Sequence, residues 1–203
     1  MNPPRSVTLA FTGASGMPYG IRLLECLLAA DVQVSLLVSS AAQIVTKQEL
    51  DWSMPSRAEE LATFLSAKYA SLPGQLRVFG REAWFAPVAS GSNPSDAMVV
   101  CPCSMGSLAA IAQGLADNLI ERAADVSIKE QRKLVLVPRE TPYSALHLEN
   151  MLKLARLGVV ILPPSPGFYH HPQSIADLID FVVARILDQL HIPHQLMARW
   201  GQE

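Results

Sequence analysis

The sequence predicts an α/β fold of three layers, in which a mostly parallel sheet is covered by helices on both faces. Short apolar runs alternate with longer amphipathic runs along the chain. Several short runs are apolar at almost every position, which is typical of parallel strands buried on both faces. The chain has 203 residues, of which 50% are hydrophobic, enough for one domain with a full core.

The first half of the chain predicts three strands, each followed by helical sequence. The helix after the first strand has Pro18 in its first turn, where a helix tolerates proline. The second strand reads VQVSLLV and leads into two further helical runs. The predicted strands are 6–11, 32–38 and 76–79, and the predicted helices are 18–30, 41–50 and 56–70.

The second half continues the alternation. The apolar runs AMVVC and KLVLVP predict buried strands, and a last short strand follows Gly158. Thr141 and Pro142 are predicted as the cap and first residue of a helix that ends at Gly158. The predicted strands are 97–101, 133–138 and 159–162, and the predicted helices are 104–113, 141–157 and 174–190.

Composition limits the classes of function. The net charge of −2 gives no basic field to attract nucleic acid, and no apolar run is long enough to span a bilayer. With no signal pattern at the N-terminus, we expect a cytoplasmic protein. Cys26, Cys101 and Cys103 form neither a disulfide framework nor a zinc motif, so buried free thiols are expected. The adjacent His170 and His171 lack further ligands nearby, and no metal site is predicted.

Small and hydroxylated residues gather just after the predicted strands. The first strand is followed by TGASGMPYG (12–20), the second by the serine pair 39–40, the fourth by PCSMGS (102–107) and the fifth by Arg139 and Glu140. Ligands of parallel sheets bind outside the carboxyl ends of the strands, and helix N-termini attract anions. The set predicts a phosphate-bearing ligand, although each serine singly is explained as a cap or turn residue.

The first loop departs from the dinucleotide-binding fingerprint. Counted from Gly13, the fingerprint requires glycine at 15 and glycine or alanine at 18. Those positions hold Ser15 and Pro18, so a pyrophosphate lying across this backbone is not expected. The loop raises the question of what a serine does in place of the middle glycine.

Charged and aromatic residues suggest two further features. Arg122 and Lys129 are seven residues apart and would share a helix face, either in a site or as part of a solvated charged surface. Trp84 and Trp200 lie outside the confident core elements. Trp200 is the fourth residue from the C-terminal end, where a large aromatic would cover a subunit contact or a site.

With these residues collected, the chain resembles the flavin prenyltransferase family of the UbiX type over essentially its whole length. The resemblance rests on TGASGMPYG (12–20), the serine pair 39–40, CPCSMGSLAAIAQGLADNLIERAADVSIKE (101–130), LVLVPRETPYSALHLENMLKLARLGVVILPPSPGFYHHP (134–172) and the terminal RW (199–200). The two long blocks are specific, whereas the first loop alone would not be.

The resemblance implies a flavodoxin- or Rossmann-like fold and a transferase that uses no metal. Members of the family join a dimethylallyl group from dimethylallyl monophosphate to N5 and C6 of reduced FMN. The product, prenylated FMN, is the cofactor of a separate family of decarboxylases, in ubiquinone synthesis or the breakdown of aromatic acids. By resemblance we expect residues 1–203 to form one FMN-binding domain that assembles into a homo-oligomer, with a dodecamer expected. The tail at about 191–203 would pack on the site or on a neighbouring subunit.

The resemblance also assigns residues, position by position. Residues that match FMN-binding positions are Gly13, Ala14, Ser15, Ser39, Ser104, Met105, Gly106, Ser107 and Arg139. Residues that match positions for the allyl phosphate are Tyr169 and Arg185, assisted by Arg122, Lys129 and Glu140. Ser15 and Glu49 match positions beside flavin N5, and Trp84 and Trp200 match aromatic walls near the prenyl group. The expected catalytic set is therefore Ser15, Glu49, Lys129 and Glu140.

Two roles follow as hypotheses. Glu140 among phosphate-binding cations suggests an acid that protonates the leaving phosphate. Ser15 and Glu49 would manage the proton on flavin N5. Two alternatives stay open: an FMN-dependent decarboxylase of the related cysteine-decarboxylase group, and a non-catalytic flavin carrier. The first lacks its expected histidine, since none precedes His147, and the second leaves the charged residues without a role.

Overall fold

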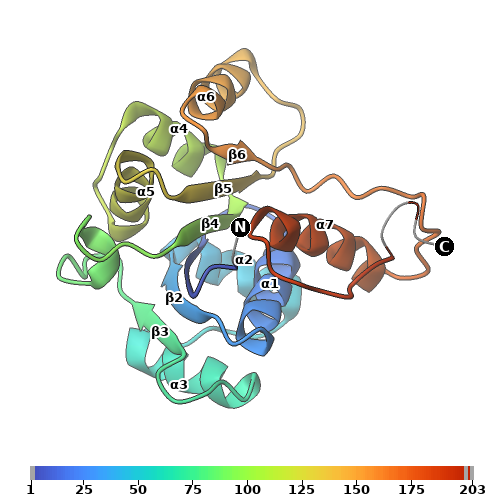
Figure 1. Cartoon of the computed structure of the whole chain (residues 1–203), viewed down its shortest axis with the longest axis horizontal. Coiled ribbons are helices and arrows are strands. Elements are labelled where there is room, and N and C mark those ends of the chain that lie inside the picture. Colours follow the sequence, from blue (N-terminus) through green and yellow to red (C-terminus); the bar gives the residue numbers. More distant parts are fainter. Residues whose placement is uncertain (1–2, 199–200, 202–203) are drawn as a thin grey trace.

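The computed structural model describes residues 3–198 and 201, in which six parallel strands form one sheet of order β3-β2-β1-β4-β5-β6 (Figure 1). Adjacent strands pair in parallel throughout. The strands are β1 (Ser6–Phe11), β2 (Gln33–Val38), β3 (Leu76–Phe79), β4 (Ala97–Cys103), β5 (Lys133–Pro138) and β6 (Val160–Ile161). The predicted parallel sheet is confirmed.

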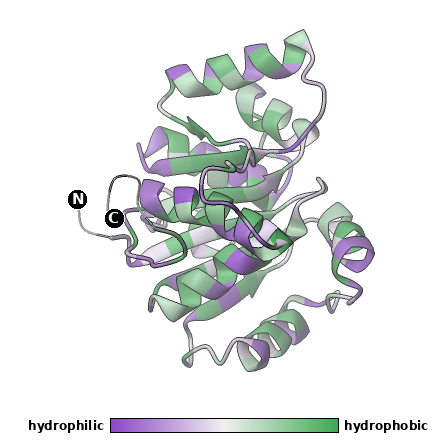
Figure 2. Cartoon of the chain, turned by 90° about the vertical axis from the view of Figure 1, so that its right-hand side faces the viewer, coloured by the Kyte–Doolittle hydropathy of each residue, from purple (hydrophilic) through white to green (hydrophobic). Residues whose placement is uncertain are grey.

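Helices cover both faces of this sheet, as predicted. One apolar cluster joins the sheet to α1 (Met17–Ala29), α2 (Ser40–Leu50), α3 (Ala58–Lys68) and α7 (Ile175–Gln189). A second cluster joins the opposite face to η1 (Pro87–Ala89), α4 (Met105–Gln113), α5 (Leu119–Lys129) and α6 (Ala145–Arg156). Hydrophobic residues dominate the strands between these layers (Figure 2). Within residues 3–198, none of the helices combines the length and apolarity that crossing a bilayer requires.

The alternation along β1 shows why both faces are covered. Val7, Leu9 and Phe11 belong to the first cluster, whereas Ala10 belongs to the second. Successive side chains of a strand point to opposite faces, so a strand that is apolar at both sets of positions needs helices on both sides. This explains how an almost uninterrupted apolar run becomes a central strand.

The strand order places a topological switch point between β1 and β4. Connections from β1 lead outward to β2 and β3, and those from β4 lead the other way to β5 and β6. A crevice forms at such a point outside the carboxyl ends of the two strands. Segment 12–16, after β1, and segment 102–107, where β4 ends and α4 begins, therefore meet at the place where a doubly wound sheet binds its ligand.

The predicted start of α6 at Thr141 and Pro142 is wrong. The helix begins at Ala145, and Ser144 is its N-cap. Ser144 Oγ accepts the His147 N–H at 3.3 Å, while His147 Nδ1 accepts the Ser144 N–H at 3.2 Å. This reciprocal capping box satisfies amides that would otherwise lack partners. The predicted end is confirmed, because Gly158 has a φ of 85° and donates its N–H to the Ala155 carbonyl.

Candidate functional site

The loops after β1 and β4 lie against each other at the carboxyl edge of the sheet. The Thr12 N–H donates to the Pro102 carbonyl at 3.2 Å, and β1 pairs with β4 from Val7 to Ala10. The Ser39 N–H, at the end of β2, donates to the Phe11 carbonyl at 3.0 Å. Three strand ends are thereby fixed relative to one another by backbone hydrogen bonds.

Glycine is required at two positions of the first loop. A Cβ at Gly13 would lie 2.4 Å from the Ala41 Cβ, so no side chain fits between this loop and α2. Gly16 has a φ of 114°, a conformation that L side chains rarely adopt. Ser15, between them, is exposed. The backbone of the loop is thus constrained at both glycines, and Ser15 is exposed between them at the switch point.

Glu49 supplies the N-terminal cap that α1 lacks. Gly16 is the N-cap residue and has no side chain, and the Glu49 carboxylate instead accepts the Met17 N–H at 2.8 Å. It also accepts the Gly16 N–H at 3.0 Å. A carboxylate at a helix N-terminus is stabilised by the orphan amides and by the helix dipole. Glu49 therefore holds the loop that carries Ser15, a role that the sequence did not reveal because the partners are 33 residues apart.

Ser39 and Ser104 cap α2 and α4, so the cap interpretation of these serines holds. Ser39 Oγ accepts the Ala42 N–H at 3.1 Å, and Ser104 Oγ accepts the Ser107 N–H at 3.2 Å. Ser104 Oγ also donates to Ser107 Oγ at 3.0 Å, which leaves the Ser107 hydroxyl hydrogen for another acceptor. Ser39 and Ser107 line the same hollow of about 140 Å³. Residues 118–121 at the N-terminus of α5 also line it. Three helix N-termini and two hydroxyls there favour an anionic ligand, although the Glu121 carboxylate does not.

Arg139 gives independent support for an anion. It follows β5 directly, and its N–H donates to the Cys103 carbonyl at 3.2 Å, which ties it to the end of β4. Its side-chain Nε is buried and has no hydrogen-bond partner among the described residues. Leaving a buried charged donor unpaired is costly, which points to a ligand that pairs with it. We call the segments 12–16 and 102–107, with Ser39 and Arg139, the strand-end cradle.

The three cysteines are free thiols whose burial disfavours the charged thiolate form. Cys101 and Cys103 are free and buried, as predicted, and Cys26 is free and partly buried. Burial raises the pKa of Cys103 to about 12 and that of Cys26 to about 11. Burial also raises the pKa of Cys101, and the nearby Cys103 raises it by a smaller amount. Because the thiolate is the reactive form, these raised pKa values do not favour a nucleophilic role for the three thiols.

Three predicted site residues are not among those that line the hollow of about 140 Å³, and we call them the α5 face: Trp84, and Arg122 and Lys129 of α5. The first turn of α5, up to Glu121, does line the hollow. Arg122 and Lys129 were expected to share a helix face only if one continuous helix joined them, and α5 is that helix. Arg122 donates from Nε to the Ala89 carbonyl at 2.9 Å, and Lys129 pairs with Glu130. Lys129 lies four residues before β5 begins, at the amino edge of the sheet. The 11 residues of α5 span about 16 Å, and only the N-terminal turn lines the hollow, so Lys129 is at the far end of the helix from the cradle.

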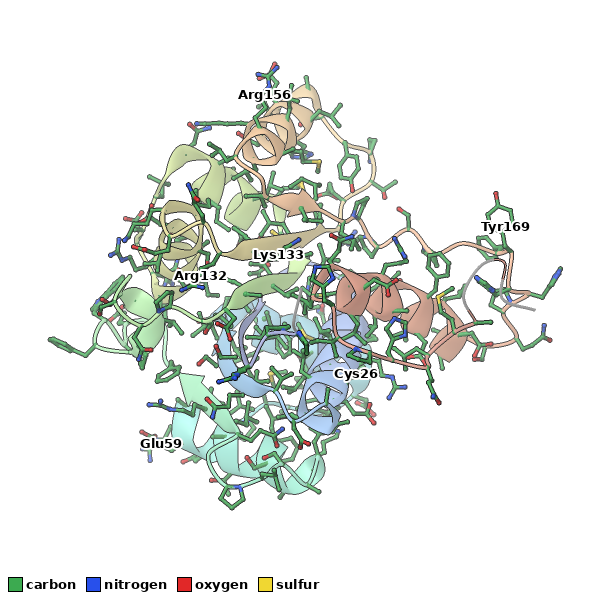
Figure 3. The ribbon with its side chains drawn as sticks, in the orientation of Figure 1. Cys26, Glu59, Arg132, Lys133, Arg156 and Tyr169 are labelled. Carbon is green, nitrogen blue, oxygen red and sulfur yellow. The ribbon has the colours of Figure 1, made fainter. Side chains whose placement is uncertain are left out.

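Tyr169 lies at the end of an arm, residues 163–174, that projects beyond α7 (Figures 1 and 3). The side chain is 77% exposed. The arm packs back on Phe181 of α7 through His170, with ring centroids 6.2 Å apart. Arg185, one turn further along α7, donates to Asp188 at 2.7 Å. Glu140, which follows Arg139, accepts the Thr141 N–H at 3.1 Å.

The predicted tail is described in part. His194 bonds to Asp188 of α7 at 3.1 Å, and Ile192 is buried in the first apolar cluster. The segment just after α7 therefore packs on its own chain. The prediction for Trp200 lies outside the described residues.

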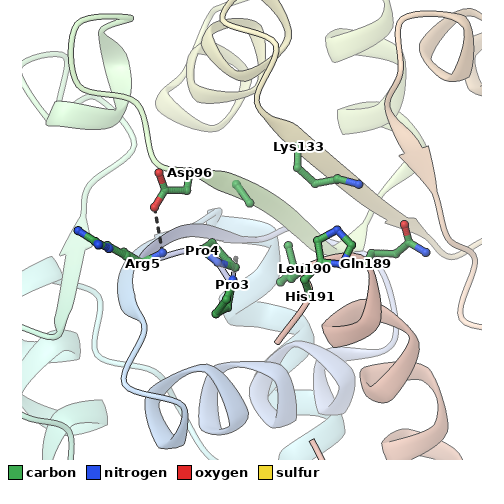
Figure 4. A pocket seen from close by; sticks show the side chains of 9 residues that line it. Pro3, Pro4, Arg5, Asp96, Lys133, Gln189, Leu190 and His191 are labelled. Carbon is green, nitrogen blue, oxygen red and sulfur yellow. Dashed lines mark hydrogen bonds between the residues drawn. The ribbon is translucent and has the colours of Figure 1, made fainter. Parts of the chain in front are cut away.

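Another hollow, of about 440 Å³, opens at the amino edge of the sheet (Figure 4). Its lining includes Arg5, Lys133 and His191 but none of the predicted site residues. The Asp96 carboxylate there accepts the Arg5 N–H at 2.9 Å and the Ser6 N–H at 3.1 Å, which holds the start of the chain. We therefore take the strand-end cradle as the candidate site.

Comparison with known proteins decides the family. The family model described as Flavoprotein matches residues 1–187. The flavin prenyltransferase UbiX of Pseudomonas aeruginosa is 56% identical over 203 residues, which cover 100% of this chain and 97% of that protein. The chain belongs to the flavin prenyltransferase family. The resemblance read from the motifs is confirmed.

Solved structures of flavin prenyltransferase relatives share the whole fold. AnUbiX, solved in complex with FMN and dimethylallyl pyrophosphate, is 41% identical with a TM-score of 0.87, covering 98% of this chain and 99% of its own. A protein of Escherichia coli O157:H7, described as a dodecameric FMN-dependent UbiX-like decarboxylase, is 41% identical with a TM-score of 0.85. That match covers 97% of this chain and 99% of the relative.

Proposed function

We propose that this chain is a flavin prenyltransferase that binds reduced FMN in the strand-end cradle and joins a dimethylallyl group to its N5 and C6 atoms. The observation that carries the proposal is the buried, unpartnered Nε of Arg139 at the switch point of the sheet. Membership of the flavin prenyltransferase family supplies the reaction class. The AnUbiX complex supports the choice of both ligands.

The cradle fits the phosphate and one edge of the flavin. Arg139, Ser39 and Ser107 would hold the phosphate with charge-assisted and hydroxyl hydrogen bonds at the N-termini of α2 and α4. Ser104, Met105 and Gly106 would border it as the first turn of α4. Gly13, Ala14 and Ser15 would lie against the ring, with Ser15 presented by the loop that Glu49 caps.

The allyl phosphate would be held by the remaining predicted residues. Reduced FMN supplies the nucleophilic atoms, and this chain's part is to stabilise the phosphate that departs. Each charge-assisted bond from Arg122, Lys129 or Arg185 is worth about 1.5–3 kcal/mol, more than the roughly 0.5–2 kcal/mol that an aromatic face gives a cation. Tyr169 would add a hydroxyl and Trp84 and Trp200 aromatic walls. Glu140 would donate the proton to the leaving phosphate.

The place of Lys129 supports a site that is shared between copies of the chain. Lys129 lies at the amino edge of the sheet, whereas the cradle lies at the carboxyl edge. We therefore propose that the α5 face of one copy completes the cradle of another in a homo-oligomer, and a dodecamer like that of the Escherichia coli relative is expected. A decarboxylase that uses prenylated FMN would accept the product. The single domain, the cytoplasmic location and the absence of a metal remain predictions.

Mass analysis of the flavin tests the proposal. The protein is incubated with reduced FMN and either dimethylallyl monophosphate or dimethylallyl pyrophosphate. The mass of the extracted flavin is then measured by mass spectrometry. A gain of one prenyl unit is expected with the monophosphate. An unchanged flavin with both donors would contradict the proposal, and a gain with the pyrophosphate alone would correct the donor.

The description of the Escherichia coli relative as a decarboxylase favours testing one other activity. The same protein loaded with FMN is offered a C-terminal cysteine peptide, the substrate class of the alternative group, and carbon dioxide release is measured. Release without any prenylated flavin would support the decarboxylase instead. We expect none, because no histidine precedes His147 to serve as its proton donor.

A further inference from the structure

Thr12 is a buried polar residue at the start of the first cradle segment, where it contacts the second. It follows β1 directly and is 1% exposed. Its Oγ1 donates to the Pro102 carbonyl at 2.8 Å and accepts the Ser104 N–H, also at 2.8 Å. A single hydroxyl thus acts as donor to Pro102 near the end of β4 and as acceptor from Ser104 just after it, about 90 positions away in the sequence.

The hydrogen bonds continue from Thr12 to the hollow. Ser104, whose amide Thr12 holds, caps α4 and donates from Oγ to Ser107 Oγ at 3.0 Å. Ser107 in turn lines the hollow that Ser39 also lines. The direction in which Ser107 can donate therefore depends on Ser104, and the placement of Ser104 depends on Thr12.

We propose that Thr12 is a positioning residue for FMN, which fixes the Ser104 and Ser107 hydroxyls where the phosphate binds. The inference rests on the proposed function, since it takes FMN as the ligand of the cradle. Thr12 is not expected to touch the ligand, because its hydroxyl is committed to the neighbouring loop. Valine would keep its shape and remove both bonds, leaving the Ser104 amide to turn toward another acceptor.

The chain offers a matched control on the same strand. Thr8 of β1 is 2% exposed, and its Oγ1 donates to Ser95 Oγ at 2.8 Å. Thr8→Val therefore also removes a buried threonine hydroxyl bond from β1, but near its amino end and away from the cradle. A loss of FMN affinity specific to Thr12 separates positioning of the ligand site from a general loss of stability.

The experiment measures the FMN dissociation constant of the apoprotein by flavin fluorescence, together with the thermal midpoint. We expect Thr12→Val to raise the constant about tenfold or more, and Thr12→Ser, which keeps the hydroxyl, to stay near wild type. Thr8→Val should lower the midpoint but leave the constant unchanged. If Thr12→Val does not fold, Thr12→Cys replaces it, since a thiol is a weak hydrogen-bonding group and should also raise the constant.

Two results would overturn the inference alone, with FMN still binding to the wild type. One is an unchanged constant in Thr12→Val or Thr12→Cys. The other is an equal rise in Thr12→Val and Thr8→Val, which would make the effect one of stability. Failure of the wild type itself to bind FMN would instead overturn the proposed function, and this inference with it.

Discussion

The strand-end cradle and the α5 face differ in how the chain supports them. Cradle residues are held by backbone bonds between strand ends, by helix caps and by the Glu49 carboxylate. On the α5 face, Trp84 is 45% exposed and the neighbouring Phe85 is 104% exposed. The proposed flavin side is therefore held by bonds within one chain, whereas Trp84, on the proposed side for the allyl phosphate, faces outward.

Exposed apolar residues elsewhere fit the same division. α6 buries only Leu154 among its described residues and leaves Leu146, Leu148 and Leu152 exposed. Phe168 of the arm is also exposed. Apolar side chains that gather on outward surfaces mark contacts with other chains. The comparison teaches that the cradle can be tested in the binding of FMN alone, whereas the α5 face should affect only the transfer step.

The largest effect is expected from Lys129→Met. Because the ammonium would stabilise charge on the departing phosphate, turnover should fall by roughly 100-fold or more while the FMN dissociation constant stays unchanged. The rate of product formation is measured by quenching the reaction at set times and quantifying prenylated flavin by mass spectrometry. Lys133→Met, a lysine at the same edge of the sheet but outside the proposed site, is the control. If Lys129→Met also weakened FMN binding, the claim that the α5 face acts only on the transfer step would be contradicted.

A somewhat smaller effect is expected from Arg139→Met, on binding itself. Loss of charge-assisted bonds to phosphate should raise the FMN dissociation constant by about 10- to 100-fold. The FMN dissociation constant of Arg139→Lys should lie between those of the wild type and Arg139→Met, since an ammonium keeps the charge but lacks the planar guanidinium. Titration of apoprotein with FMN gives the constants, with Arg132→Met on an exposed turn as control. Equal affinities for all variants would remove Arg139 from the phosphate site.

Glu49→Gln should have a moderate effect on stability. The amide keeps one acceptor for the Met17 N–H but loses the charge at the α1 N-terminus, so the free energy of unfolding should fall by about 1 kcal/mol. Urea unfolding measures it, and Glu25→Gln, in a part-exposed ion pair, is the control. An unchanged unfolding energy with lost turnover would mean that Glu49 acts only on the flavin proton.

The smallest effect is a pH dependence from the buried thiols. The folded pKa of Cys103 is raised to about 12 from 9.0, so its stability contribution is complete below about pH 9 and declines as the pH rises toward 12. Urea midpoints should therefore fall between pH 8 and pH 10, and fall less in Cys103→Ala. An identical decline in both proteins would assign it to other groups.

The sequence predicted the sheet and most helices because buried parallel strands and amphipathic helices leave clear local patterns. The start of α6 was wrong because two capping signals, Thr141 and Ser144, compete within four residues, and only the His147 partner decides between them. The strand β4 also continues through Pro102 to Cys103, where the register shifts, although the apolar run was expected to end at Cys101.

The site was only partly predictable. The serines and Arg139 could be expected from their places after strands, but their roles as FMN ligands came from family resemblance. The bonds of Glu49 to Gly16 and of Thr12 to Ser104 join residues far apart in sequence, and no local pattern signals them. Nor could spacing reveal that Lys129 lies at the edge opposite the cradle, because that follows from the direction of α5.

The most direct measurement of the central claim is complementation between two inactive variants. Arg139→Met and Lys129→Met chains, each with its own tag, are coexpressed, and mixed assemblies are purified through both tags. Turnover is assayed at an FMN concentration that saturates a cradle with Arg139 but not one with Arg139→Met. If cradle and α5 face come from different copies, about a quarter of the sites should combine two intact halves and turnover should return. No activity above that of the separate variants would show that both residues serve the site from one chain, which would contradict the account.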